Sequence, residues 1–484
     1  MLFAFFLVMK KLLLNLSLFF FMVFPGEAFT SDATPQTWLG PEEKLFVELM
    51  HQARFDPAAT ALSLGIDLDI LYQERPEMSF LLQQKLPALE ISHKLFRAAS
   101  SHSQDMLSHD YYSHQGLDGS SPQDRMFREG YDPFIVIEEL GLMGFRNYVG
   151  PEQATLALFA QTFIHELQFG DLSKPVFLNP YFKHAGIGIA KGFLRLDSFS
   201  GNAYISTLDL AAEEDVLLEL MLRRKINDAR LAPESALSLL SDQEESIFVA
   251  QESTDRLPKR KQSPVAMSGE LTSIARFLGR EFLHDHGLEE YNTGFPYDPK
   301  GFGPDIFPEF AHKILVIPVD SGSTFEDLAN KSFRTLLLSE LEASEESEPF
   351  IFNIGFSKSG IGAFRLEYAG HEYLLVVVLL SGCEDDPKYL VGQVVFKSEH
   401  ERDFLEEQSV RIYLSNIDES SLNGFSVTGP GGYYQVEVSD NTHPFNEMRL
   451  ENAAGETMEK VRVFMHRGNQ RVDFLLECDS VACE

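Results

Sequence analysis

Two segments of this 484-residue chain carry the same features in the same order, and this constrains the fold more than any other property of the sequence. Glu166 precedes Gly186 by the same interval as Glu340 precedes Gly360, and each glycine opens a Gly-Ile-Gly run. The start of each segment shares an Ala-Arg pair, a proline and an Ala-Leu-Ser-Leu run: Ala53-Arg54, Pro57 and Ala61–Leu64, then Ala229-Arg230, Pro233 and Ala236–Leu239. Ordered matches at nearly fixed spacing indicate a duplicated unit. We therefore expect residues 213–382 to be a degenerate copy of residues 42–212.

Hydrophobic periodicity within the first segment predicts both helices and strands. Apolar residues at helical spacing predict a helix over residues 92–109 and a second helix around Leu156–Leu167. Two β-rich runs, Gly186–Ile189 and Ala203–Leu208, are separated by turn-forming residues and predict neighbouring strands. The fold class expected for this segment is therefore α+β.

The pattern changes from about residue 386. Apolar residues alternate with polar or aromatic ones around Val410–Leu414, Val461–Met465 and Val472–Leu476, and glycine-rich turns separate these runs. Short alternating runs between turns are typical of an all-β sandwich. We expect residues 386–484 to form such a module.

The beginning of the chain has the layout of an export signal. Lys10 and Lys11 precede an apolar run, Leu12–Phe24, and small or turn-forming residues follow it. This order predicts a signal peptide over residues 1–28 and a secreted or periplasmic protein. The alternative is a membrane anchor, but the apolar run is short for a span of about twenty residues. We expect no stable anchor.

Net charge and cysteine content exclude several classes of function. The formal net charge of −33 argues against nucleic acid as a partner, because phosphate binding needs clustered Lys and Arg. The chain has three cysteines, Cys383, Cys478 and Cys483, which is too few for a disulfide framework and gives no metal-binding cysteine pattern.

Between His102 and Gly188 the sequence resembles the CAP superfamily of cysteine-rich secretory proteins, antigen 5 and pathogenesis-related 1. Four runs carry the resemblance: His102–Met106, Tyr112–His114, Asp118–Tyr131 and Leu178–Gly188. The resemblance implies a three-layer α-β-α sandwich with a cleft lined by two His and two Glu. It thus implies a CAP domain over residues 42–212.

The resemblance places this cleft residue by residue. The first His falls on His114, and the first Glu falls on Glu138, or on Glu139 if the register is one residue later. The second Glu falls on Glu166, three residues after an aromatic helix residue. The position of the second His holds Ser173, so the tetrad is incomplete. Asp124 and Arg125 are expected to form a structural ion pair, and His102 to be a hydrogen-bonded core residue.

The missing His bears on metal binding. A catalytic zinc usually has three protein ligands, and of the expected His pair only His114 remains as a candidate metal ligand. His165 and His184 are possible substitutes, although His165 points about 100° around its helix from Glu166. We expect no cofactor, or at most weak zinc binding.

The function expected from these features is non-enzymatic. The cleft would bind a small apolar or lipid-like ligand or a cell-surface component, and the second copy and the β module would serve as scaffold or adhesion modules. The rival is a hydrolase of peptide or cell-wall bonds that uses His114 as general base with Glu138 or Glu166. A third possibility is a structural surface protein in which both copies are inactive.

Overall fold

The computed structural model describes residues 38–197, 199–240, 257–258, 260–285, 310–341, 349–368, 370–382, 386–397, 409–417, 421–439, 445–465 and 468–477. The chain divides into two compact units, Met1–Glu214 and Asp215–Glu484, and each is described by itself. The expected signal peptide and the three cysteines lie outside the described residues. Among the described residues, no helix has the length and apolar character needed to cross a membrane.

The first unit contains both helices and strands, as its periodicity predicts. Its helices are α2 (Pro41–Phe55), α3 (Pro57–Ser63), α4 (Leu68–Glu74), α5 (Met78–Leu81), α6 (His93–Ser108), α7 (Pro122–Arg128) and α8 (Pro151–Phe169). Its strands are β1 (Glu90–Ile91), β2 (Ile135–Phe145), β3 (His184–Leu196) and β4 (Phe199–Ala212). The helix predicted over 92–109 is confirmed as α6, and the predicted pair of strands is confirmed as the antiparallel neighbours β3 and β4.

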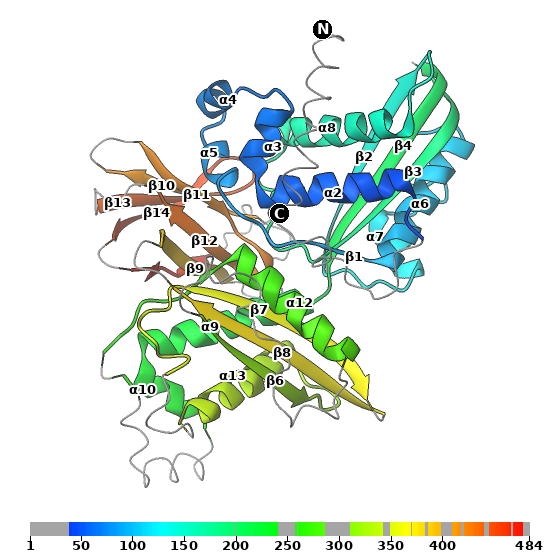
Figure 1. The fold of residues 1–484 in the computed structure, drawn as a ribbon. Helices are drawn as coiled ribbons and strands as arrows, with labels where there is room; N and C mark the ends of the chain where they lie inside the picture. Colours follow the sequence, from blue (N-terminus) through cyan, green and yellow to red (C-terminus); the bar gives the residue numbers. More distant parts are fainter. Residues whose placement is uncertain are drawn as a thin grey trace. The chain divides into compact units, whose positions relative to one another are not determined.

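These strands form one sheet between two layers of helices (Figure 1). The strand order is β1-β3-β4-β2, with β1 parallel to β3 and the other two pairings antiparallel. Helix α6 packs on β3 and β4, and α8 packs against the other face, where it contacts β2. Gly186 allows the close approach of β3 and α6, because a Cβ there would lie 2.2 Å from the backbone of Leu95. The first unit is therefore a three-layer α-β-α sandwich.

The second unit begins with a sheet of the same order. Its helices are α9 (Asp215–Leu231), α10 (Pro233–Ala236), the 3-10 turn η1 (Leu237–Leu239), α12 (Gly269–Asp285) and α13 (Phe325–Leu341). Its first strands are β5 (Ala266–Met267), β6 (Phe310–Pro318), β7 (Lys358–Tyr368) and β8 (His371–Ser381), in the order β5-β7-β8-β6. As in the first unit, the short first strand is parallel to its neighbour and the other pairings are antiparallel.

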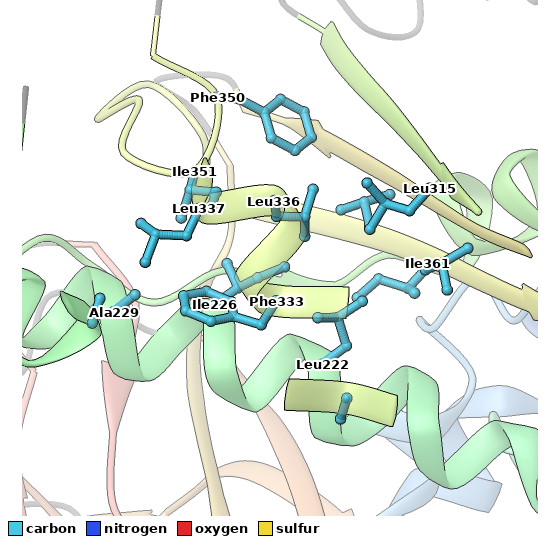
Figure 2. Packing of buried hydrophobic residues seen from close by; sticks show 14 of the residues in the cluster. Leu222, Ile226, Ala229, Leu315, Phe333, Leu336, Leu337, Phe350, Ile351 and Ile361 are labelled. Carbon is cyan, nitrogen blue, oxygen red and sulfur yellow. The ribbon is translucent and has the colours of Figure 1, made fainter. Parts of the chain in front are cut away.

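The main core of this part lies between the sheet and the helices α9 and α13. Leu222 and Ile226 of α9 meet Phe333 and Leu336 of α13, and Ile361 of β7 joins them from the sheet (Figure 2). Helix α12 covers the opposite face, where its leucines pack against alternate residues of β8. Alternate residues of β8 therefore pack on opposite faces of the sheet, which explains why residues 374–380 are all apolar.

The remaining strands of the second unit build two further sheets. They are β9 (Lys388–Lys397), β10 (Arg411–Asn416), β11 (Leu422–Val427), the 3-10 turn η5 (Pro430–Gly432), β12 (Tyr433–Val438), β13 (Phe445–Glu451), β14 (Thr457–Phe464), β15 (Gln470–Arg471) and β16 (Phe474–Glu477). One sheet has the order β11-β10-β13-β14, and the other has β12-β9-β15 with β16 also on β9. Residues of both sheets share one hydrophobic core that includes Leu390, Leu414 and Met448.

Candidate functional site

Glu138 lies at the centre of a buried polar cluster. It is a residue of β2, its side chain is 1% exposed, and it faces α7. Arg125 of α7 donates from Nη2 to one of its oxygens and from Nη1 to the carbonyls of His114 and Ser120. The expected Asp124–Arg125 pair is wrong, because Asp124 instead completes a capping box with Ser121 at the start of α7.

His114 reaches the same carboxylate from the loop after α6. Its Nδ1 lies 2.9 Å from Glu138 Oε1, while its side chain is 60% exposed. The hydrogen bond to Glu138 is the main cause that raises the pKa of His114, against a smaller lowering by burial. The structure thus brings His114 and Glu138 together, with the imidazole at the surface and the carboxylate beneath it.

His102 and Asp209 complete the cluster from α6 and β4. His102 is buried, its Nε2 lies 2.9 Å from the carbonyl of Ser113, and it lies 4.0 Å from Glu138. Burial and the nearby Arg125 charge lower the pKa of His102, so the ring is neutral and its Nε2 donates to Ser113. His102 is therefore a hydrogen-bonded core residue, as its place on the apolar helix face suggests.

Asp209 is a member of the cluster that sequence reasoning missed. It is the cross-strand neighbour of Glu138 and is buried. Burial, and then the Glu138 charge, raise its pKa well above the ordinary value. The raised pKa keeps a proton on Asp209, and the hydrogen bond between the two side chains lets two carboxyl groups occupy one buried site.

A cavity of about 430 Å³ opens beside this cluster. One wall is α6, and the other is the loop before α7 together with α7 itself. The lining is Ala98, Ser101, His102, Asp105, His109, Gly116, Leu117, Asp118, Ser120, Arg125, Arg128 and Glu129. Most of these side chains are polar or charged, and Arg125 and His102 belong to the buried cluster. Glu138 and His114 are not in the lining, but Arg125, which lines the cavity, contacts both of them.

The carboxylate of Glu166 binds the backbone of a loop. Glu166 is buried in α8, and its carboxylate accepts the backbone N–H groups of Val176 and Phe177 at 2.8 Å and of Leu178 at 3.2 Å. Burial raises its pKa to about 7, and these three hydrogen bonds act in the opposite direction. In the second unit Glu340 binds the N–H groups of Phe350 and Ile351 in the same way.

A buried arginine holds the same loop from its other side in both units. Arg54 donates to the carbonyls of Pro87, Phe177 and Asn179. Arg230 donates to those of Ser263, Ile351, Asn353 and Phe356. We call each arginine, glutamate and loop a brace: Arg54, Glu166 and residues 176–179 in the first unit, Arg230, Glu340 and residues 350–353 in the second.

The other positions considered for the cleft lie apart from the cluster. Ser173 is buried, and its hydroxyl donates to Asp171 at 2.8 Å. Glu139 follows Glu138 on β2; burial raises its pKa, the charges of His114 and His165 lower it, and its own charge raises the pKa of Glu166. His165 is exposed, and His184 lies 2.7 Å from the hydroxyl of Tyr131. None of these side chains joins His114 and Glu138.

The residues present do not fit a zinc ion. Within the described ranges, no three His, Cys, Asp or Glu side chains are arranged to hold a metal. The Nδ1 atom of His114 already faces Glu138, and the Arg125 guanidinium occupies the other carboxylate oxygen. The Arg125 guanidinium therefore takes the place that a metal ion would need at Glu138.

Sheet register shows what stands at the cluster positions in the second unit. Glu138 pairs with Asp209, which pairs with Gly186. The corresponding chain of partners in the second sheet is His312, Leu379 and Gly360. The second sheet therefore has no carboxylate at either position, although it keeps the brace.

Comparison with known proteins gives one family. Residues 53–195 match the family model of the cysteine-rich secretory protein family, CAP. No curated protein matches the chain.

Two solved structures show low similarity. An extracellular protein with an SCP domain from Bacillus anthracis is 18% identical, over 26% of this chain and 35% of that one, with a TM-score of 0.17. An outer surface protein of Borrelia burgdorferi is 15% identical, over 30% of this chain and 92% of that one, with a TM-score of 0.18. This chain thus spans about a third of the first structure.

The matched residues, 53–195, contain His114, Glu138, the cavity and most of the first sheet, so the similarity to the CAP family lies in the part of the chain that carries the candidate site.

Proposed function

We propose that this chain is an exported CAP-domain protein that binds a small polar ligand in the cavity of its first unit, without covalent chemistry. The observation that carries the proposal is the cavity of about 430 Å³ against the buried cluster of His102, Arg125, Glu138 and Asp209. Cavities of this size that hold a few convergent polar groups are typical of small-molecule sites.

The two sheets support a functional reading of this cluster. Burying ionisable groups costs stability unless every charge is paired. The second unit holds the same strand order and brace with His312 and Leu379 at the positions of Glu138 and Asp209. Such a sheet folds without the cluster, so stability alone does not account for Glu138 and Asp209.

A catalytic role for the same residues is the second candidate. The observation in its favour is the 2.9 Å contact between exposed His114 and buried Glu138, because a carboxylate behind an imidazole orients it as a general base. A lone His–Glu pair still needs a nucleophile and donors for the developing charge. In the cluster Arg125 is held by Glu138 and two carbonyls, so its donors face inward.

The polar lining changes the ligand class that we propose. The sequence suggests an apolar or lipid-like ligand, but Leu117 and Ala98 are the apolar side chains among the twelve residues of this cavity. Nine of the other ten residues have polar or charged side chains, and the tenth is Gly116. A polar ligand replaces the water that solvates these groups, whereas an apolar one leaves them unpaired.

The remaining parts of the chain are proposed as support for this domain. We propose that residues 213–382 are a degenerate second CAP-like copy and that residues 386–484 are a β-sandwich module. The matching strand orders and the two braces support the first assignment. The shared core of the last two sheets supports the second. Gln435 joins these parts by bonding both backbone groups of Met267.

We also propose that residues 1–28 direct export, which makes the protein secreted or periplasmic. The lysine pair before the apolar run Leu12–Phe24 supports this, and the net charge of −33 suits a soluble exported protein. The partner would then be a small solute or a component of the cell surface.

The test is a fragment screen by ligand-observed NMR on the full chain and two variants. Ser101→Trp fills the cavity, and Ser108→Trp places the same side chain on an exposed position of α6 that does not line it. Hits that bind the wild type and Ser108→Trp but not Ser101→Trp support the proposal. Equal binding to all three contradicts it.

A parallel assay decides between binding and catalysis. Wild type and His114→Ala are incubated with peptide and peptidoglycan substrates. Negligible turnover in both agrees with a binding role. Turnover by the wild type that disappears in His114→Ala would establish the hydrolase instead.

A further inference from the structure

The charges that line the cavity are not balanced. The guanidinium of Arg125 is paired with Glu138, and that of Arg128 lies 2.7 Å from Asp118. Glu129 is paired with Arg97 at 2.6 Å. Each of these ion pairs is locally neutral, so neither arginine is left to attract an anion.

Asp105 is the carboxylate that remains. It accepts a hydrogen bond from the hydroxyl of Tyr111, which carries no charge, and lies 2.9 Å from the exposed ring of His109. Its side chain is 39% exposed, so it faces the open part of the cavity. Among the described lining residues, Asp105 is the acid without an Arg or Lys partner.

His102 adds an acceptor next to this carboxylate. His102 and Asp105 are three residues apart on α6, so their side chains lie on one face of the helix. Because Nε2 of His102 is used by Ser113, its Nδ1 is the acceptor atom, and the nearest donor is the Tyr111 hydroxyl at 3.5 Å. That distance is the outer limit of a hydrogen bond, so the acceptor is poorly satisfied.

A carboxylate beside a neutral nitrogen acceptor suits one class of ligand group. A primary ammonium carries three N–H donors and a positive charge, and it has no acceptor atom. A carboxylate or phosphate would face Asp105 with its own negative charge and would find both arginines already bound. A neutral hydroxyl would satisfy the acceptors but not the charge.

We propose that the cavity binds the ammonium group of a small hydroxylated amine through Asp105 and His102. The inference rests on the proposed function, because it names the ligand class of the same cavity. The hydroxyl of Ser101 and the rim around Ser120 contact the rest of the ligand. The volume of about 430 Å³ accommodates a group of the size of an amino sugar.

The experiment uses four matched probes and the full chain. D-Glucosamine, N-acetyl-D-glucosamine, D-glucose and D-glucuronate differ in the charge that they present on one ring. Affinities come from chemical-shift titrations. We expect glucosamine to bind at least tenfold more tightly than the two neutral sugars, which corresponds to about 1.4 kcal/mol, and glucuronate to bind most weakly.

Two variants locate the effect. Asp105→Asn should lower the glucosamine affinity about tenfold or more and should lower the affinities of the neutral sugars by a clearly smaller factor, because asparagine keeps a polar group and removes only the charge. Asp110→Asn removes the same charge at a nearby exposed position that does not line the cavity. It should leave all affinities unchanged.

The outcomes separate this inference from the proposed function. Equal affinity for glucosamine and glucose, or an equal loss in Asp110→Asn, overturns the ammonium site while binding in the cavity stands. If none of the four probes shifts cavity resonances, the ammonium inference also fails. The proposed function is then judged by the fragment hits and their loss in Ser101→Trp.

Discussion

Glu138 and Asp209 are direct cross-strand neighbours on β2 and β4, and both carboxyl side chains are buried. Two ionised carboxylates at such a position repel each other strongly in a medium of low dielectric. The proton on Asp209 removes this repulsion and supplies a hydrogen-bond donor to Glu138. The charge of Glu138 is thereby left for Arg125 and His114.

The raised pKa of Asp209 makes the stability of the first unit depend on pH. The contribution of Asp209 is complete below its unfolded pKa of 3.8 and is lost as the pH rises through its folded pKa. Asp209→Asn keeps a donor and cannot ionise. Its advantage over the wild type should therefore grow with pH, by about 1.4 kcal/mol for each pH unit below the folded pKa. Urea unfolding between pH 4 and pH 8, followed by fluorescence of Trp38, measures this difference.

The fluorescence of Trp38 reports on the first unit because the chain has one tryptophan, which contacts His93 and Phe96. Asp69→Asn removes a carboxyl group from an exposed position of the same unit and serves as the matched control. Glu166 titrates equally in both proteins, so its effect cancels. If the unfolding free energies of Asp209→Asn and the wild type differ by the same amount at every pH, Asp209 is ionised in the folded state.

The hydrogen bond between His114 and Glu138 should be visible in the titration of the imidazole. It raises the pKa of His114 above 6.5, so its stabilising effect is complete below about pH 6.5 and is lost as the pH rises through the folded pKa. Glu138→Gln should return the pKa toward 6.5 or below, because burial then acts without the carboxylate. NMR titration of the ring protons measures the shift.

Glu139→Gln is the matched control for this titration, since Glu139 is the smaller of the two causes. It should lower the pKa of His114 by less than Glu138→Gln does. An equal shift in the two variants would show that the total negative charge near the loop, and not the hydrogen bond to Glu138, raises the pKa of His114.

The two braces should stabilise their own units to a similar extent. Arg54→Met leaves three carbonyls without their donor, and Arg230→Met leaves four. Unsatisfied buried groups cost about 1–3 kcal/mol each, so each change should cost about 3 kcal/mol or more. Arg54→Met should shift the urea transition seen by Trp38, and Arg230→Met should shift the transition seen only by far-UV circular dichroism. A change of less than about 1 kcal/mol in either variant would contradict the role of the brace.

Sequence reasoning identified what depends on local pattern. Helix α6 and the β3–β4 pair follow from periodicity and turn residues. Strand β2 was not predicted, because Glu138, Glu139 and Gly141 interrupt any regular alternation along it. The central residue of the site, Glu138, therefore lies on a strand that the sequence pattern does not indicate.

The remaining site residues depend on pairing between distant segments. Asp209 lies between Leu208 and Leu210 in an apolar run, and only the β2–β4 register places it opposite Glu138. Local reasoning paired Arg125 with its neighbour Asp124, but the capping box uses Asp124 and turns Arg125 inward. Glu166 matches the family motif, yet its environment is set by the loop that folds back onto α8.

Gly186 and Gly188 of β3 determine which wall of the cavity can move. A Cβ at Gly186 or Gly188 would lie 2.2–2.3 Å from the backbone of α6, so helix and strand touch without side chains between them. At this contact no glycine side chain can change its rotamer to accommodate a movement of the helix. A ligand that displaced α6 would therefore have to displace the sheet as well, so this wall of the cavity is rigid. The cavity would adapt to the shape of a ligand through movement of Gly116–Ser120 and α7. The sequence of that loop would then determine which of several ligands of similar charge binds.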